Sequence, residues 1–139
     1  MNENRHRHSA GGIIFNNGKV LTLEWTNKEG IEFPKGTLNP GEASEAAALR
    51  EVREETGYDT KIVAALPSIE YDFTLADGKN YHKVVDFYIM ELANNNDPTP
   101  RREPGETFEN LWLDVDDAID LLTYDDSKEL LKQALAINT

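Results

Sequence analysis

The chain has 139 residues, a length that fits one domain, so we expect a single domain over residues 1–139. It contains no cysteine, which excludes disulfides, thiolate metal sites and a cysteine nucleophile. Its 26 Asp and Glu against 14 Lys and Arg give a net charge of −12, a field that repels nucleic acid polymers and anionic membrane surfaces at long range.

The N-terminal part is predicted to form strands and a loop. It begins with MNENRHRHSAGG, which lacks the apolar stretch of a secretory signal, and no apolar run approaches the ~20 residues of a membrane span, so a cytoplasmic location is expected. Arg5 to Phe15 ends in the small and apolar run SAGGIIF, and we expect its RHRH part to be structural and not a metal site. Asn16-Asn17-Gly18 predicts a hairpin turn before the alternating segment KVLTLEW. The following GIEFPKGTLNPGE is dense in Gly and Pro and is predicted to be a loop.

A helix is predicted from Ser44 to Thr56, with the sequence SEAAALREVREET. Ser44 is the candidate N-cap, Ala and Glu dominate the interior, and Gly57 stands where a C′ glycine belongs. Small and apolar residues on one side, Ala47, Ala48 and Val52, are expected to pack against a sheet.

The remaining chain is predicted to alternate between strands, turns and two short helices. KIVAAL and SIEYDFTL are predicted strands, and Ala76-Asp77-Gly78-Lys79 turns the chain into the long strand YHKVVDFYIMEL. Asn94 to Glu106 is a polar, proline-rich loop, and the strand FENLWL follows it. Amphipathic helices are predicted at Val115–Leu122 and Ser127–Ile137, the second with the apolar stripe Leu130, Leu131, Ala134, Leu135 and Ile137. This pattern favours an α+β or mixed-sheet domain with helices on both faces.

One face of the helix predicted over residues 44–56 is acidic. At roughly 100° per residue, Glu51, Glu54 and Glu55 fall within about 100° of one another. Like charges so spaced destabilise an isolated helix, whereas a bound cation reverses the sign of the interaction. Mg²⁺ takes carboxylate oxygens and is often completed by substrate phosphates, so it suits this face, with Mn²⁺ as a substitute. Arg50 lies four residues before Glu54 and can pair with it; an ordinary solvated surface helix is the alternative interpretation.

The stretch Gly36 to Tyr58, GTLNPGEASEAAALREVREETGY, resembles the Nudix box at every fixed position. These positions are Gly36, Glu42, Arg50, Glu51, Glu54, Glu55 and Gly57. Seven identities at roughly one in ten each make a chance match about 10⁻⁷ for each starting point. SAGGIIF and NLWLDVDDAIDLL also resemble the flanking elements of the family, so the chain is identified as a member of the Nudix hydrolases. The resemblance implies an α/β/α sandwich with a mixed β-sheet.

The resemblance implies hydrolysis of a phosphoanhydride bond in a nucleoside diphosphate linked to a moiety X, by attack of water on phosphorus. The implied metal ligands are box carboxylates, one carboxylate outside the box and one backbone carbonyl: Glu51, Glu54, Glu55, Glu106 (with Glu103 in reserve) and Lys35. Glu42 would brace the junction between loop and helix, and Arg50 would orient the carboxylates. Glu51 is the first choice for the general base, with Glu55 and Glu106 as open alternatives.

The substrate is suggested by FPKGTLNPGE, which resembles a form common among diadenosine and diphosphoinositol polyphosphate hydrolases. Candidate phosphate contacts are Lys35 and Lys83, and candidate nucleobase contacts are Tyr71, Tyr81 and His82. Ordinary solvation or packing is the alternative for each of these residues and is favoured for all of them except Lys35, whose place in the loop suggests a phosphate contact. Because other basic residues are few, mainly Arg101-Arg102, a dinucleoside polyphosphate such as diadenosine tetraphosphate is favoured over an inositol compound.

Several alternatives to that substrate remain. They are a nucleoside triphosphate, ADP-ribose, a diphosphoinositol polyphosphate, a Nudix domain that senses a nucleotide without cleaving it, and an acidic interaction module. The expected partner is a small nucleotide, with no nucleic acid polymer and no membrane. Either a monomer or a homodimer is compatible with the sequence.

Overall fold

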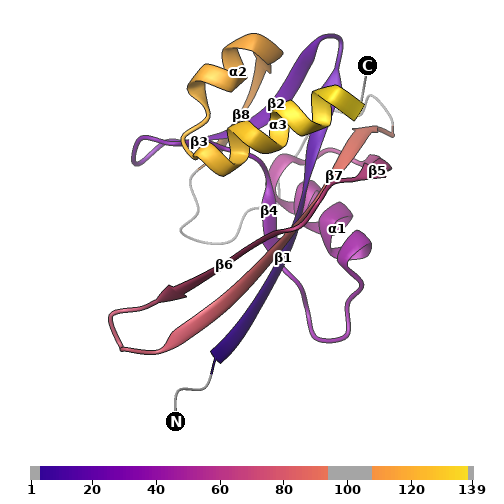
Figure 1. Cartoon of the computed structure of the whole chain (residues 1–139). Helices are drawn as coiled ribbons and strands as arrows, with labels where there is room; N and C mark the ends of the chain where they lie inside the picture. The colour runs from indigo at the N-terminus through magenta and orange to yellow at the C-terminus, as the bar shows by residue number, and fades with distance from the viewer. Residues whose placement is uncertain (1–3, 94–107, 138–139) are drawn as a thin grey trace.

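The computed structural model describes residues 4–93 and 108–137. Within these ranges the elements in chain order are β1 (Asn4–Asn16), β2 (Lys19–Trp25), β3 (Ile31–Glu32), β4 (Lys35–Thr37), α1 (Ser44–Thr56), β5 (Thr60–Ala65), β6 (Ile69–Thr74), β7 (Asn80–Leu92), β8 (Phe108–Asp114), α2 (Val115–Leu121) and α3 (Asp125–Ile137). Figure 1 shows α1 on one side of the strands and α2 with α3 on the other. The predicted α+β class with helices on both faces is therefore confirmed.

The two longest strands, β1 and β7, form the centre of the sheet. They run parallel, in register from Asn4↔Asn80 to Ile14↔Met90. Strands β3 and β2 continue the sheet on the β1 side and β5 on the β7 side, while β4 pairs with β1, β6 with β7 and β8 with β2. The other strand pairs are antiparallel, so the sheet is mixed as predicted.

Each face of the sheet carries its own apolar core. On the side of α2 and α3, Ile13, Phe87 and Ile89 pack with apolar residues of both helices. On the other side, Ala47, Ala48 and Val52 of α1 pack with residues that include Ala10, Ile14 and Met90, which confirms the predicted packing side of that helix. Side chains alternate between the two faces along β1 and β7, so this one pair of strands contributes apolar residues to both cores.

Helix α1 has the predicted bounds, Ser44–Thr56, but not the predicted N-cap. The capping position is occupied by Ala43, whose side chain makes no capping hydrogen bond. Ser44 is the first helical residue, and its Oγ donates to Asp86 Oδ2 at 2.6 Å and accepts from the Tyr88 hydroxyl at 3.0 Å, so it does not cap the helix. At the other end Gly57 has φ 83° and its N–H bonds to the carbonyl of Arg53, as expected for a C′ glycine.

Other departures from the predicted elements are local. Segment 30–42, predicted as loop, contains β3 and β4, because their backbone groups pair with β2 and β1. Helix α3 begins at Asp125, before the predicted Ser127, and α2 ends at Leu121. Leu130, Leu131 and Ala134 are buried, but Ile137, predicted within the apolar stripe, is 53% exposed. No helix in the described ranges is long and apolar enough to cross a membrane.

Candidate active site

Three carboxylates converge on one guanidinium at the start of the acidic helix face. Arg50 donates to Glu42 through Nε and Nη2, both at 2.8 Å, and through Nη1 to Glu51 at 2.7 Å and Glu54 at 3.1 Å. Its Nη2 also donates to the carbonyl of Thr37 at 3.0 Å. Hydrogen bonds from Arg50 and from the Asn39 backbone lower the pKa of Glu42 to about 2. Glu42 thus ties the loop after β4 to α1, which is the bracing position that the resemblance implied.

The carboxylate of Glu51 lies against the backbone of Gly36. A side chain at position 36 would overlap this carboxylate, so only glycine allows the approach. Lys35 directly precedes Gly36 on β4, so its backbone carbonyl is one residue away from the backbone that contacts Glu51. The two residues predicted as metal ligands on different elements, Glu51 and Lys35, are therefore brought to one side of α1.

The donor set around this contact has the chemistry of a hard-cation site. Its members are carboxylates of one helix face and a carbonyl, the oxygen ligands that Mg²⁺ prefers. Glu55 is 8% exposed and Glu54 is part-exposed, and each lies within one turn of Glu51. Within residues 4–93 and 108–137, no three His, Asp or Glu side chains are already gathered around one point to hold an ion. The Arg50 guanidinium lies between the carboxylates of Glu42, Glu51 and Glu54 and supplies positive charge there. The predicted residues Glu103 and Glu106, with Arg101 and Arg102, lie outside the described ranges.

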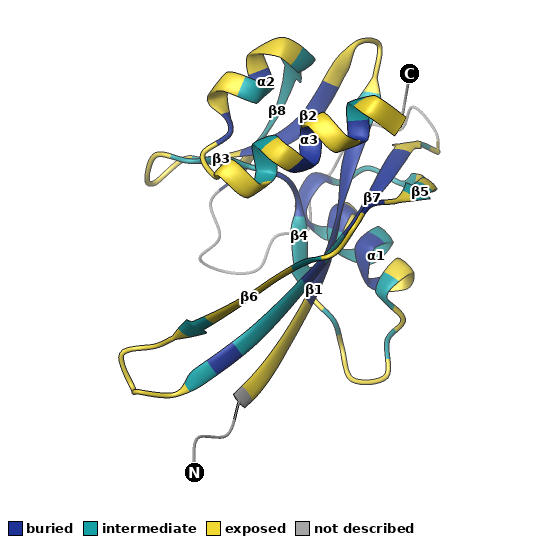
Figure 2. Cartoon of the chain, viewed as in Figure 1, coloured by how far each residue is buried: buried dark blue, intermediate teal, exposed yellow. Residues whose placement is uncertain are grey.

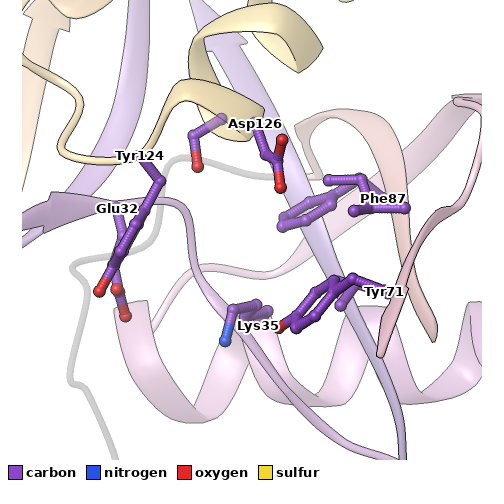
Figure 3. A pocket seen from close by; sticks show the side chains of 9 residues that line it. Glu32, Lys35, Tyr71, Phe87, Tyr124 and Asp126 are labelled. Atoms are coloured by element: carbon purple, nitrogen blue, oxygen red, sulfur yellow. The ribbon is translucent and has the colours of Figure 1, made fainter. Parts of the chain in front are cut away.

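A cavity of about 410 Å³ opens beside Lys35. Its lining residues are Glu32, Lys35, Ile69, Tyr71, Val85, Phe87, Tyr124, Asp126 and Ser127. Figure 3 shows Lys35 extending into the space between Tyr71 and Tyr124, with Phe87 and Asp126 facing it. Burial raises the pKa of Tyr71, and the charge of Asp126 adds to the effect, so its hydroxyl remains a proton donor at neutral pH. Aromatic rings with a few polar groups are the usual lining of a pocket for a small organic ligand.

The remaining predicted substrate contacts lie at different places on β7. Lys83 is half-buried next to the cavity, since it pairs across the sheet with Tyr71. Tyr81 is only 5% exposed and stacks on Phe73, which agrees with packing as its role. His82 projects to the opposite face, where its Nδ1 lies 2.8 Å from Asp72 Oδ1. The hydrogen bond with Asp72 raises the pKa of His82.

Several lining residues of the cavity were not among the sequence predictions. Val85 and Phe87 share a strand face with Lys83, and Ile69 shares one with Tyr71, so alternation along the strands contains a signal for them. Tyr124 lies in the link between α2 and α3, and Asp126 lies in the first turn of α3. Both reach the cavity only because those helices pack on the sheet, which no local sequence pattern reveals.

A hydrogen-bond network on the opposite face of β7 fixes the start of α1. Asp86 accepts from Ser44 at 2.6 Å and from Ser68, and its Oδ2 lies 2.6 Å from His8 Nε2. Tyr88 donates in turn to Ser44 at 3.0 Å. Burial raises the pKa of Asp86, but the hydrogen bonds outweigh it and the net shift is downward. The carboxylate is therefore held ionised between β1, α1 and the segment before β6.

Comparison with known proteins gives consistent matches. The profile described as NUDIX domain matches residues 5–134. A Mycobacterium tuberculosis protein designated mutator protein MutT4 is 36% identical over 93% of this chain, and a mouse ADP-sugar pyrophosphatase is 36% identical over 64%. The chain spans only 54% and 40% of the lengths of these relatives. The structure of a C. elegans Ap4A hydrolase binary complex superposes with a TM-score of 0.72 at 26% identity, covering 95% of this chain and 97% of that one.

Proposed function

Since the chain belongs to the NUDIX domain family, we propose that it is a metal-dependent hydrolase of phosphoanhydride bonds whose substrate is a dinucleoside polyphosphate such as diadenosine tetraphosphate. One observation carries this proposal. Lys35 lines the aromatic cavity with its side chain, and the next residue, Gly36, contacts the carboxylate of Glu51. A base in the cavity would therefore have its phosphates directed toward the acidic face of α1.

Nudix hydrolases generally need a divalent metal, and we propose Mg²⁺, with Mn²⁺ as a substitute. The carboxylates of Glu51, Glu54 and Glu55 and the carbonyl of Lys35 would hold it, with Glu106 as a further ligand. When bound, such an ion neutralises phosphate charge and lowers the pKa of water. Arg50 keeps Glu51 and Glu54 directed to one side of α1 and limits their mutual repulsion before the substrate arrives.

Side chains of the protein would act as the general base and would bind the phosphates and the nucleobase. Glu51 is our first choice to take the proton of the attacking water, with Glu55 and Glu106 as alternatives. Lys35 and Lys83 carry positive charge next to the cavity, where they would offset phosphate charge. Tyr71 and Tyr124, which are 43% and 56% exposed, offer ring faces to a nucleobase, and stacking on each is favourable for any base.

A second candidate is a pyrophosphatase of another nucleotide, since one relative is named an ADP-sugar pyrophosphatase. Support for a dinucleoside polyphosphate comes from the FPKG form of the loop and from the similarity to the Ap4A hydrolase structure over nearly the whole of both chains. A non-catalytic nucleotide-sensing domain is disfavoured, because the box retains all its fixed acidic positions.

The test is a panel of compounds assayed with Mg²⁺ for kcat/KM. It contains diadenosine tetraphosphate, ADP-ribose, nucleoside triphosphates including 8-oxo-dGTP, and a diphosphoinositol polyphosphate. We expect the highest kcat/KM for diadenosine tetraphosphate. A higher value for another compound would replace the proposed substrate, and tight binding of a nucleotide without product from any compound would replace the enzyme with a sensor.

A further inference from the structure

Part of the sheet extends away from the helices as a three-stranded arm. It consists of residues 4–9 of β1, 69–74 of β6 and 80–85 of β7, and Figure 1 shows it projecting beyond both helical layers. Figure 2 shows that its outer strands are mostly exposed. The cavity lies at the base of this arm, because Ile69 and Val85, which pair across it, both line the cavity.

The register of the arm separates its two faces chemically. Lys83 pairs with Arg7 on one side and Tyr71 on the other, and Tyr81 likewise pairs with Arg5 and Phe73. Paired residues of neighbouring strands point to the same face. One face, here called the basic face, therefore contains Arg5, Arg7, Tyr71, Phe73, Tyr81 and Lys83. It continues directly into the cavity wall along β7, where Val85 and Phe87 follow Lys83 at alternate positions.

Cations on the two faces of the arm differ in their partners. On the opposite face, His82 pairs with Asp72 and Glu70, and His8 pairs with Asp86. On the basic face, neither Arg7 nor Lys83 forms an ion pair with a carboxylate of residues 4–93 or 108–137, and the same is true of Lys35 in the cavity. In a chain of net charge −12 this is a local excess of unpaired positive charge.

The pKa of Lys83 reflects this excess of positive charge. Burial lowers its pKa, and repulsion by Lys35 and Arg7 adds to the effect. Glu32 opposes the shift without forming an ion pair. A half-buried ammonium beside two other cations is stabilised by a bound anion, and the cavity from which such an anion would extend is adjacent.

The Arg7 guanidinium is already placed over an aromatic ring. Its guanidinium carbon lies 5.1 Å from the centroid of the Tyr81 ring, and Tyr81 stacks on Phe73 with centroids 5.1 Å apart and an interplanar angle of 10°. The ring supports one side of the arginine, while the residue as a whole is exposed. A guanidinium plane held in this way can stack with a nucleobase on its outer side, which an ammonium cannot do.

We propose that the basic face of the arm is a subsite for the distal nucleotide of a two-ended substrate, in which Lys83 contacts phosphate and Arg7 stacks on the second base. This assignment rests on the proposed function, because it takes the first base to occupy the cavity. It makes the arm a determinant of preference for dinucleoside polyphosphates over nucleotides with one base.

The experiment compares diadenosine tetraphosphate with adenosine 5′-tetraphosphate, which lacks the second nucleoside and ends in a free terminal phosphate. Their Kd values are measured by calorimetry with Ca²⁺ in place of Mg²⁺ to slow turnover, for the wild type, Arg7→Gln and Arg7→Lys. We expect the preference for the two-ended ligand to fall about tenfold in Arg7→Gln. Arg7→Lys should recover little of it, because it restores charge without a plane. His6→Gln, a neighbour on the opposite face of the arm, should keep the wild-type preference.

The outcomes separate this proposal from the proposed function. A preference unchanged in Arg7→Gln, or no binding of either ligand by the wild type, would overturn the subsite. Arg7-dependent binding of an RNA with a 5′-triphosphate more tightly than diadenosine tetraphosphate would also overturn it. If the Kd preference depends on Arg7 but no product forms with Mg²⁺, the subsite is supported and the proposed hydrolase is rejected. Circular dichroism of each variant establishes that it is folded.

Discussion

Arg50 holds Glu42 through two parallel hydrogen bonds of 2.8 Å, from Nε to Oε2 and from Nη2 to Oε1. This bidentate pair joins residues eight positions apart and fixes the loop after β4 on the side of α1. The same guanidinium holds Glu51 and Glu54, so the pair also determines where two of the candidate ligands point. Glu42 therefore acts on the acidic face through Arg50.

The pair predicts a specific pH dependence of stability. The pKa of Glu42 is lowered from 4.5 to about 2, so its contribution is complete above the unfolded-state value and is lost as pH falls through the folded-state value. We expect Glu42→Gln to lower the free energy of unfolding by about 1–3 kcal/mol at neutral pH. The difference from wild type should shrink between about pH 5 and pH 2 in urea titrations. A difference independent of pH would contradict the ion pair as its cause.

A second prediction concerns the candidate metal ligands. Glu54→Gln removes a carboxylate charge without changing its volume, so we expect kcat with Mg²⁺ to fall by about a hundredfold or more. The melting temperature should change little, because Glu54 is part-exposed on a face of like charge. Glu45→Gln is the matched control, an exposed glutamate in the first turn of the same helix. Turnover of Glu54→Gln close to that of Glu45→Gln would remove Glu54 from the site.

Gly36 provides a test of the contact between β4 and α1. In Gly36→Ala the added methyl group overlaps the Glu51 carboxylate and displaces it from its position beside Lys35. Displacement of a reacting group by an ångström can reduce the rate by about a hundredfold, so we expect kcat to fall by roughly ten- to a hundredfold. Gly18→Ala is the control, since Gly18 has φ +77° but no atom near its added methyl group. It should lose stability by about 1–2 kcal/mol and keep its kcat.

The sequence predicted best what depends on local pattern. Helix α1 has the predicted bounds because its Ala-rich side and terminal Gly57 act within the helix itself. The pairing of Arg50 with Glu54 was likewise predictable, because residues at i and i+4 are neighbours on any helix. In contrast, Ser44 was predicted as the N-cap but bonds to Asp86, which lies 42 positions away on β7 and is invisible to a local rule.

Only two of the residues that line the cavity were among the candidate substrate contacts, for the same reason. Lys35 was named as a candidate phosphate contact from its place in the loop, and Tyr71 as a candidate nucleobase contact from its aromatic type, and both line the cavity. Tyr81 has the same type and a similar context but is buried on Phe73, because the register of β6 against β7 decides which ring is covered. Tyr124 reaches the cavity through the packing of α2 and α3, a tertiary arrangement that the residues around it do not encode.

Asp86 is predicted to position α1 without touching the substrate. Asp86→Asn keeps the size of the side chain but replaces one acceptor oxygen with a donor, so the bonds from Ser44, Ser68 and His8 cannot all persist. We expect a loss of about 1–3 kcal/mol in the free energy of unfolding and a fall of roughly tenfold in kcat, with KM less affected. Ser68→Ala removes one bond without loosening α1 and serves as the control. An effect of Asp86→Asn on KM alone would indicate direct contact with the substrate instead.

The last prediction tests the layer formed by α3. Leu131 is fully buried against the core shared with β1 and β7, so Leu131→Ala leaves a cavity and should lower the free energy of unfolding by about 2–5 kcal/mol. Ile137 lies on the same helix but is 53% exposed, and its replacement by alanine should cost less than about 0.5 kcal/mol. Urea unfolding of both variants measures the contrast. Tyr124 directly precedes α3 and Asp126 lies in its first turn, and both line the cavity, so Leu131→Ala should also raise KM. Equal effects of the two variants on the free energy of unfolding would mean that α3 is not anchored as described.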